Sequence, residues 1–304
     1  MPVSFGAVMS SQPIPVLRSA GAAYSFLYAH WRRFLLAAAP FTLAYAVQLW
    51  LAQKALGAPL SGFWLTLDAT AMIALTVGSL AFSAMSFRLA VRGEYAGQWG
   101  LRLGGDEWRL FVVALLNAAL VLIVALLTAM FAFVVFSTIA GGAIEQAGID
   151  PEAAGVDLPT AMSYMSTADW VAAWVVNGIA FLLVAWLVAR LSMSFPASFA
   201  QQAVRVLSVW TLSEGQAWRI LGAMALAALP LMLVQIGLYE LVCLALDARP
   251  LMTPVTVGDE VMTSGGFARA PEYLRVTGLF SVINLPVMAG LYAQFYKVRS
   301  AETA

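Results

Sequence analysis

Six stretches of nearly unbroken apolar residues divide this chain. They cover residues 34–51, 63–87, 110–138, 170–195, 220–246 and 276–296. Each is long enough to cross an apolar layer of roughly 30 Å as a helix that rises about 1.5 Å per residue. The third stretch lacks the strict polar–apolar alternation of a membrane barrel strand. The pattern therefore predicts an all-α, polytopic membrane protein with six transmembrane helices.

The positive charges predict which way these helices face, because Lys and Arg gather in cytoplasmic connections. With the N-terminus inside, 12 of the 16 basic residues lie on the inner side. We therefore expect both termini in the cytoplasm. The expected organisation is a cytoplasmic segment 1–30 with an interfacial helix, a six-span domain 31–298 and a cytoplasmic tail 299–304. Two long loops, 138–169 and 247–275, should lie outside, and the first of them could hold one short helix.

A Trp-Arg pair recurs where three of the apolar stretches begin. The pairs are Trp31-Arg32, Trp108-Arg109 and Trp218-Arg219. Trp prefers the level of the lipid headgroups, and Arg prefers the cytoplasmic interface. Before the third pair, residues 201–213 would form an amphipathic helix lying in the interface plane. We therefore expect a parallel repeat of helical hairpins, each with an interfacial helix, closing around a pseudo-threefold axis.

Residues 189–230 carry a pattern that resembles a known family. The residues that carry it are Arg190, Pro196, Trp210, Leu212, Gly215, Trp218 and Arg219. The segment looks like the bacterial membrane proteins related to the membrane domain of glycerophosphodiester phosphodiesterases. The resemblance implies a multi-pass module of a bacterial inner membrane. The phosphodiesterase barrel and its histidines have no counterpart in this chain, so the resemblance implies no activity.

Composition narrows the possible functions. The chain is 62% hydrophobic and 11% charged, whereas soluble domains have about 45–50% apolar and about 25% charged residues. A net charge of zero gives no basic surface for nucleic acid. The single Cys243 and the single His30 exclude an intramolecular disulfide and a His-His metal pair. We find no catalytic constellation, and we expect no enzyme activity, cofactor or metal.

Two sets of residues are candidates for a functional site. The interfacial set, which could bind lipid phosphate or merely anchor the topology, comprises Arg88, Arg92, Arg190, Arg205, Arg219, Trp31, Trp108 and Trp218. The intramembrane polar set, which could line a path or simply form hydrogen bonds between helices, comprises Asp68, Asn117, Asn177, Gln235, Glu240 and Asn284. The Gly-rich stretch 101–107 lacks the GK[ST] ending of a phosphate-binding P-loop.

Three functions fit these observations. The first is a non-enzymatic module that binds or moves lipid or another amphiphile, with membrane lipid as its partner. The second is a transporter or channel for a small solute, based on the intramembrane polar set. The third is a structural or assembly subunit that meets a protein partner, or a second copy, through its acidic outer loop.

Overall fold

The computed structural model describes residues 13–57, 61–97, 99–149, 158–245, 255–257, 260–262 and 278–301. Helices make up nearly all of this part of the chain. The α-helices are α1 (Val16–Gly57), α2 (Phe63–Arg92), α3 (Gly105–Gln146), α5 (Leu158–Ser163), α6 (Thr167–Leu191), α7 (Ser194–Gln201), α8 (Ala217–Ala245) and α11 (Ser281–Ser300). The 3-10 turns are η1 (Leu207–Val209) and η2 (Gly278–Phe280), and β1 (Val255–Val257) pairs antiparallel with β2 (Glu260–Met262).

Five of these helices are long and apolar enough to cross a membrane: α1, α2, α3, α6 and α8. They mark the chain as a membrane-embedded helical protein. The expected sixth span corresponds to α11, which is not among the five because it carries polar residues such as Asn284, Gln294 and Lys297. Instead, α11 packs along α1 and also contacts α2 and α8. Many of its side chains are therefore buried against protein.

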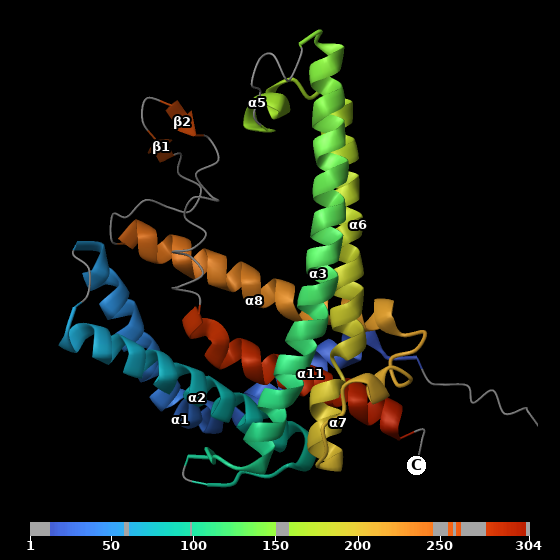
Figure 1. Ribbon diagram of the computed structural model, residues 1–304. Helices are drawn as coiled ribbons and strands as arrows, with labels where there is room; N and C mark the ends of the chain where they lie inside the picture. Colours follow the sequence, from blue (N-terminus) through green and yellow to red (C-terminus); the bar gives the residue numbers. More distant parts are fainter. Residues whose placement is uncertain are drawn as a thin grey trace, which may run out of the picture.

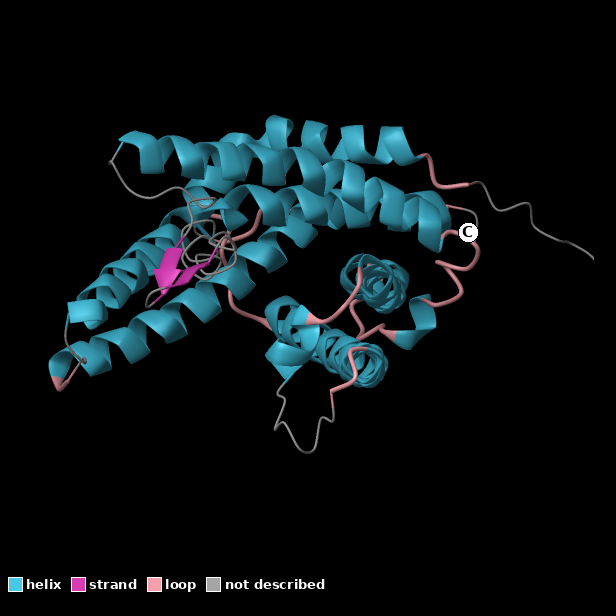
Figure 2. Ribbon diagram, turned by 90° about the horizontal axis from the view of Figure 1, so that it is seen from above, coloured by secondary structure: helices cyan, strands magenta, loops and turns pink. Residues whose placement is uncertain are grey.

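The helices fall into two groups. One is a bundle of α1, α2, α8 and α11, and the other is the pair α3 and α6, which run side by side (Figure 1). Seen from above, the bundle helices lie lengthwise while the pair is viewed nearly end-on (Figure 2). The two groups of helices therefore run in clearly different directions.

The three Trp-Arg segments have three different structures. The segment before Trp31 is helical and continuous with α1, and residues 93–104 before Trp108 are mostly a loop. The helix expected at 201–213 is wrong, because α7 ends where Gln202 adopts a left-handed conformation with φ of 51°. Only η1 and turns follow before Trp218. The three units are therefore not equivalent, although α11 does pack along α1 as the proposed closure requires.

A close contact fixes α11 against α1. A Cβ added to Gly290 of α11 would lie 2.8 Å from Cδ1 of Phe26 in α1. Only glycine leaves room for the Phe26 ring, so the two backbones approach closely at this level. At its C-terminal end, Lys297 of α11 donates a hydrogen bond of 2.8 Å to the carbonyl oxygen of Ala90 in α2.

The expected loops and ends are covered only in part. Helix α3 continues to Gln146, past residue 138 where the first expected loop begins, and α5 lies within that expected loop. In the second expected loop, 247–275, the structure describes only β1 and β2. At the ends, α1 begins at Val16 and α11 continues to Ser300, while residues 1–12 and 302–304 lie outside the described residues.

Candidate functional site

The buried arginines of the interfacial set occupy two separate environments. Arg88 and Arg92 lie in the last turns of α2, and Arg190 lies in the last turn of α6. Arg88 is 2% exposed and Arg190 is 6% exposed. A buried guanidinium loses its hydration, so its partners decide whether it is a structural ion pair or a site for a ligand.

Arg88 and Arg92 belong to an ion-pair cluster with the first turn of α3. Arg88 Nε lies 3.2 Å from Asp106 Oδ2, and Arg88 Nη2 also pairs with Glu107. Arg92 pairs with the same Asp106, whose other oxygen lies 2.7 Å from Arg109 Nη1. We call Arg88, Arg92, Asp106, Glu107 and Arg109 the α2–α3 cluster.

The local sequence explains why this cluster forms. Asp106 and Glu107 occupy the first turn of α3, where the helix dipole favours negative charge. Arg88 and Arg92 are four residues apart, so they lie on one face of α2. These carboxylates give both arginines acidic partners from within the chain. The cluster therefore ties the end of α2 to the beginning of α3 across the loop 93–104.

The loop itself is held by aromatic contacts. The guanidinium carbon of Arg33 lies 5.3 Å from the ring centre of Tyr95, and Gly100, with φ of 78°, lies so close to that ring that a Cβ would clash with it. Burial raises the pKa of the Tyr95 hydroxyl, and the charge of Arg33 opposes this shift. Tyr95 is therefore protonated, and neutral, at physiological pH.

Arg190 has a different environment, formed by two tryptophans. Its guanidinium carbon lies 4.4 Å from the ring centre of Trp210 and 5.4 Å from that of Trp186. The two rings meet edge to face, with centres 5.6 Å apart. In the described part of the chain no carboxylate pairs with Arg190, and its buried Nε has no hydrogen-bond partner. Among the described residues, its guanidinium is contacted by the two tryptophan rings and by no acidic side chain.

An apolar groove begins at one of these tryptophans. It has a volume of about 310 Å³ and is lined by Ile179, Leu182, Leu183, Trp186 and Trp218. Trp186 thus touches both the Arg190 guanidinium and the groove. Trp218 is 64% exposed, and the neighbouring Arg219 is also exposed. We call Arg190, Trp186 and Trp210 together with this groove the α6 site.

The remaining interfacial residues do not join either site. Trp31 is exposed and lies beside Arg32, whose guanidinium carbon is 5.4 Å from the ring centre. Trp108 is exposed and stacks on Phe111. Arg205 is exposed, and its backbone N–H donates to Ser198 Oγ at 2.9 Å. These side chains have the exposure that interfacial anchors need.

Four of the six intramembrane polar residues form separate side-chain hydrogen bonds: Asn117, Gln235, Asn284 and Asp68. Asn117 donates to Ser194 Oγ at 2.7 Å, and Gln235 donates to Asn284 Oδ1 at 2.9 Å. The carboxylate of Asp68 accepts from Gln48 at 3.0 Å. The amide of Asn177 donates to a backbone carbonyl of its own helix. Glu240 is half-buried in α8. In none of the described cavities do two of these six residues meet, so the structure favours hydrogen bonding over a shared path.

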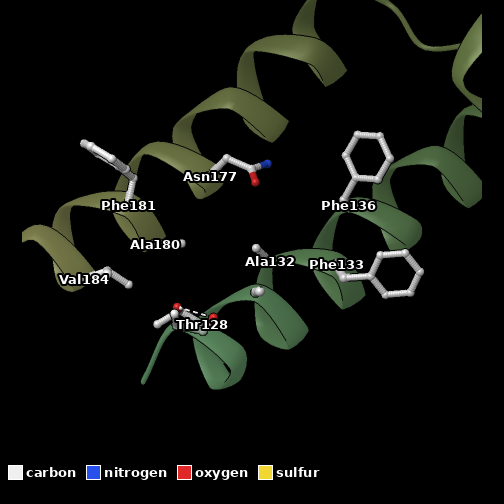
Figure 3. Close-up of a pocket in the computed structure, with 10 residues that line it drawn as sticks. Thr128, Ala132, Phe133, Phe136, Asn177, Ala180, Phe181 and Val184 are labelled. Atoms are coloured by element: carbon white, nitrogen blue, oxygen red, sulfur yellow. Dashed lines mark hydrogen bonds between the residues drawn. The ribbon is translucent and has the colours of Figure 1, made fainter. Parts of the chain in front are cut away.

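A larger groove of about 520 Å³ separates the middle parts of α3 and α6. Its walls are small or aromatic, including Ala132, Phe133 and Phe136 on α3 (Figure 3). Asn177 and Phe181 lie on the facing helix, α6, with the Asn177 amide turned toward the gap. Asn177 is its single amide, and the groove contains no charged residue. It is therefore a surface for apolar groups and offers no catalytic chemistry.

Sequence reasoning did not identify Asp106, Glu107 or Trp186. A usable signal was present for Trp186, because it precedes Arg190 by four residues and so shares its helix face. The acidic first turn of α3 was a second signal, but its partners lie 18 and 19 residues earlier in the chain. Among the described residues no group of three or more His, Cys, Asp or Glu could hold a metal ion.

Comparison with known proteins adds no relative. No family model matches the chain, and neither a curated protein nor a solved structure matches it. The resemblance to the membrane domain of glycerophosphodiester phosphodiesterases therefore stays a prediction. Any functional conclusion has to come from the geometry of the sites themselves.

Proposed function

We propose that this protein is a non-enzymatic membrane module that binds an anionic lipid or a similar amphiphile at the α6 site. One observation carries the proposal: a buried arginine without an acidic partner stands at the end of an apolar groove. An anionic amphiphile is complementary to this combination, with a charged group for Arg190 and a chain for the groove. The arginine distribution predicts that this end of α6 faces the cytoplasm, and the family resemblance implies that the membrane is a bacterial inner membrane.

The energetics of Arg190 support a ligand. Removing an ion from water costs several kcal/mol even after the protein relaxes. A cation held over an aromatic face regains about 0.5–1 kcal/mol at exposed sites and about 2 kcal/mol when desolvated. Two tryptophan faces therefore leave part of the cost uncompensated. A phosphate or carboxylate oxygen would supply the remainder as a charge-assisted hydrogen bond.

The groove supports an apolar chain in the same ligand. Each methylene group transferred from water to an apolar surface contributes about 0.8 kcal/mol. Leu182, Leu183 and Ile179 provide such a surface about two to three helical turns from Arg190. Trp218 forms the opposite wall from the beginning of α8. A ligand with only a charged group would leave this groove unused, which favours an amphiphile over a small soluble anion.

The experiment is mass spectrometry of lipids that co-purify with the protein in mild detergent. Arg190→Met removes the charge while keeping the size, and Leu183→Trp fills the groove while keeping the charge. Arg18→Ala, an exposed arginine at the start of α1, is the matched control. We expect one anionic lipid class to be enriched in the wild type and in the control, and to be lost in both site variants.

Two outcomes would refute the proposal. The same bulk lipid in all four proteins would reduce Arg190 to a topology anchor. Loss of the lipid in the control as well would show that general surface charge, and no particular site, retains it. All four proteins keep Arg88 and Arg92. A lipid bound at the α2–α3 cluster would therefore be retained in every variant and would not be mistaken for a lipid at the α6 site.

A further inference from the structure

A second cavity, at the beginning of α3, is polar where the α6 groove is apolar. It has a volume of about 280 Å³. Four arginines line it: Arg88, Arg92, Arg102 and Arg109. Three carboxylates also line it: Glu94, Asp106 and Glu107. The arginines outnumber the carboxylates, so the cavity retains positive charge after its ion pairs are formed.

Three buried side-chain atoms of residues that line this cavity have no hydrogen-bond partner among the described residues: Arg88 Nη1, Arg92 Nε and Glu107 Oε2. Arg92 Nε still lies 3.4 Å from Glu94 Oε2 in an ion pair, so Arg88 Nη1 and Glu107 Oε2 are the two atoms without any partner. Both side chains are nine-tenths buried or more, with exposed fractions of 3% for Arg88 and 4% for Glu107. Buried polar groups in proteins nearly always have hydrogen-bond partners. A bound group that accepts from Arg88 Nη1 and donates to Glu107 Oε2 would therefore satisfy both atoms.

The beginning of α3 adds further donors to the same cavity. Gly104, the residue before the helix, provides no side-chain cap, and Gly104 and Gly105 both line the cavity. The first N–H groups of a helix have no partner within it, and the helix dipole makes this end an attractive place for an anion. Glycines leave these N–H groups uncovered. This stretch is not a P-loop, because it lacks the required lysine, but it offers backbone donors.

We propose that this cavity binds a phosphate group that retains a proton, as inorganic phosphate or as a phosphate monoester. Its unprotonated oxygens accept from Arg88 Nη1 and from the α3 N–H groups, and its P–OH donates to Glu107 Oε2. Sulfate and phosphodiesters have no proton near neutral pH, so they would place a lone pair against the Glu107 carboxylate. The proposal uses different residues from the α6 site and does not depend on the proposed function.

Replacing Arg102 tests the proposal without disturbing the fold. Arg102 is exposed, lines the cavity, and forms no ion pair with any described residue. Its guanidinium is free to approach a bound anion. Removing it should weaken phosphate binding while leaving the α2–α3 cluster intact. Arg18→Ala is again the matched control, since Arg18 is exposed and lies outside the cavity.

The test is calorimetric titration of the purified, detergent-solubilised protein with inorganic phosphate and with sulfate at equal ionic strength. We expect phosphate to bind at least about tenfold more tightly than sulfate, because sulfate leaves Glu107 without a donor. Arg102→Ala should weaken phosphate binding several-fold with an unchanged melting temperature, and Arg18→Ala should not. Glu107→Gln, whose amide can donate to sulfate, should abolish the preference.

Three results would overturn the proposal: no phosphate binding at millimolar concentration, equal binding of sulfate and phosphate, or equal weakening by Arg102→Ala and Arg18→Ala. Further titrations identify the source of the phosphate group. Tighter binding of glycerol 3-phosphate than of inorganic phosphate indicates a soluble monoester. Preferential binding to vesicles with phosphatidic acid over vesicles with phosphatidylglycerol indicates a lipid monoester.

Discussion

Asp106 joins three arginines, so its replacement tests whether the α2–α3 cluster stabilises the protein. Asp106→Asn removes the carboxylate charge shared by Arg88, Arg92 and Arg109 with little change in size. After the change Arg88 retains Glu107 and Arg92 retains the exposed Glu94 at 3.4 Å, but Arg109 retains no ion pair with a described residue. The cluster would then hold three arginines and one buried carboxylate.

The size of the effect follows from burial. Breaking a buried ion pair by removing one partner costs about 3–5 kcal/mol, whereas an exposed pair contributes about 0–1 kcal/mol. The side chain of Asp106 is 17% exposed and that of Arg88 is 3% exposed, while Arg109 is 29% exposed. Because Asp106 is itself partly exposed, we take the lower end of the range for buried pairs, a loss of about 3 kcal/mol in the free energy of unfolding. Loss of the favourable helix-dipole interaction adds up to about 1 kcal/mol.

The assay is denaturant unfolding in mild detergent and phosphate-free buffer, followed by tryptophan fluorescence. Glu94→Gln is the matched control, because Glu94 pairs with Arg92 but is 56% exposed. It should change the unfolding free energy by less than about 1 kcal/mol. If Asp106→Asn were no more destabilising than Glu94→Gln, the cluster would not be a structural element and the argument from burial would fail.

Three further predictions concern helix packing and helix ends. Gly290→Val should destabilise the protein by about 1–3 kcal/mol, because the new side chain meets the Phe26 ring at the α1–α11 contact; unchanged thermal melting would refute this. A double-mutant cycle with Gln235→Ala and Asn284→Ala should give a coupling of about 0.6 kcal/mol for their 2.9 Å hydrogen bond, and a coupling of zero would contradict it. Ser166→Ala removes the capping box of α6 and should cost about 1 kcal/mol in denaturant unfolding, whereas Ser163→Ala, in α5, should change little.

The apolar lengths in the sequence predicted the long helices well. The expected spans 34–51, 63–87 and 110–138 lie within α1, α2 and α3, because about 18 or more apolar residues in a membrane leave the backbone little alternative to helix. The sixth expected span corresponds to α11, which packs against protein. The sequence does not reveal this, because apolar residues that pack against protein look the same in sequence as those that face lipid. The side on which each end of a helix lies stays a prediction of the arginine distribution.

The interfacial helix predicted at residues 201–213 does not form, and the reason is local. Its periodicity was correct, but Ser198 Oγ accepts a hydrogen bond from the backbone N–H of Arg205 at 2.9 Å. A serine side chain that binds the backbone competes with helix formation. Gln202 and Gly215, both with positive φ, then end regular structure on either side of η1. Periodicity cannot reveal such a contact between residues seven positions apart.

The sequence pointed to the buried arginines as candidate site residues, but it did not predict which other side chains each arginine contacts. Both Arg88 and Arg190 end an apolar helix, so the sequence treated them as equivalent. Folding gives Arg88 two carboxylates from α3 and gives Arg190 two tryptophan rings. That difference arises from tertiary contacts across loops, which spacing within one helix does not encode.

The packing of α11 along α1 has a consequence for the order of events during synthesis. About 220 residues separate the end of α1 from the beginning of α11. At about 5–20 residues per second, the ribosome needs about 10–45 s to add them. During that interval Phe26 lacks its contact with Gly290, while α2, which is made earlier, already supplies Phe82 and Leu89 to the same cluster. The α1–α2 hairpin therefore forms first, and the packing of α11 on α1 is a late step of assembly.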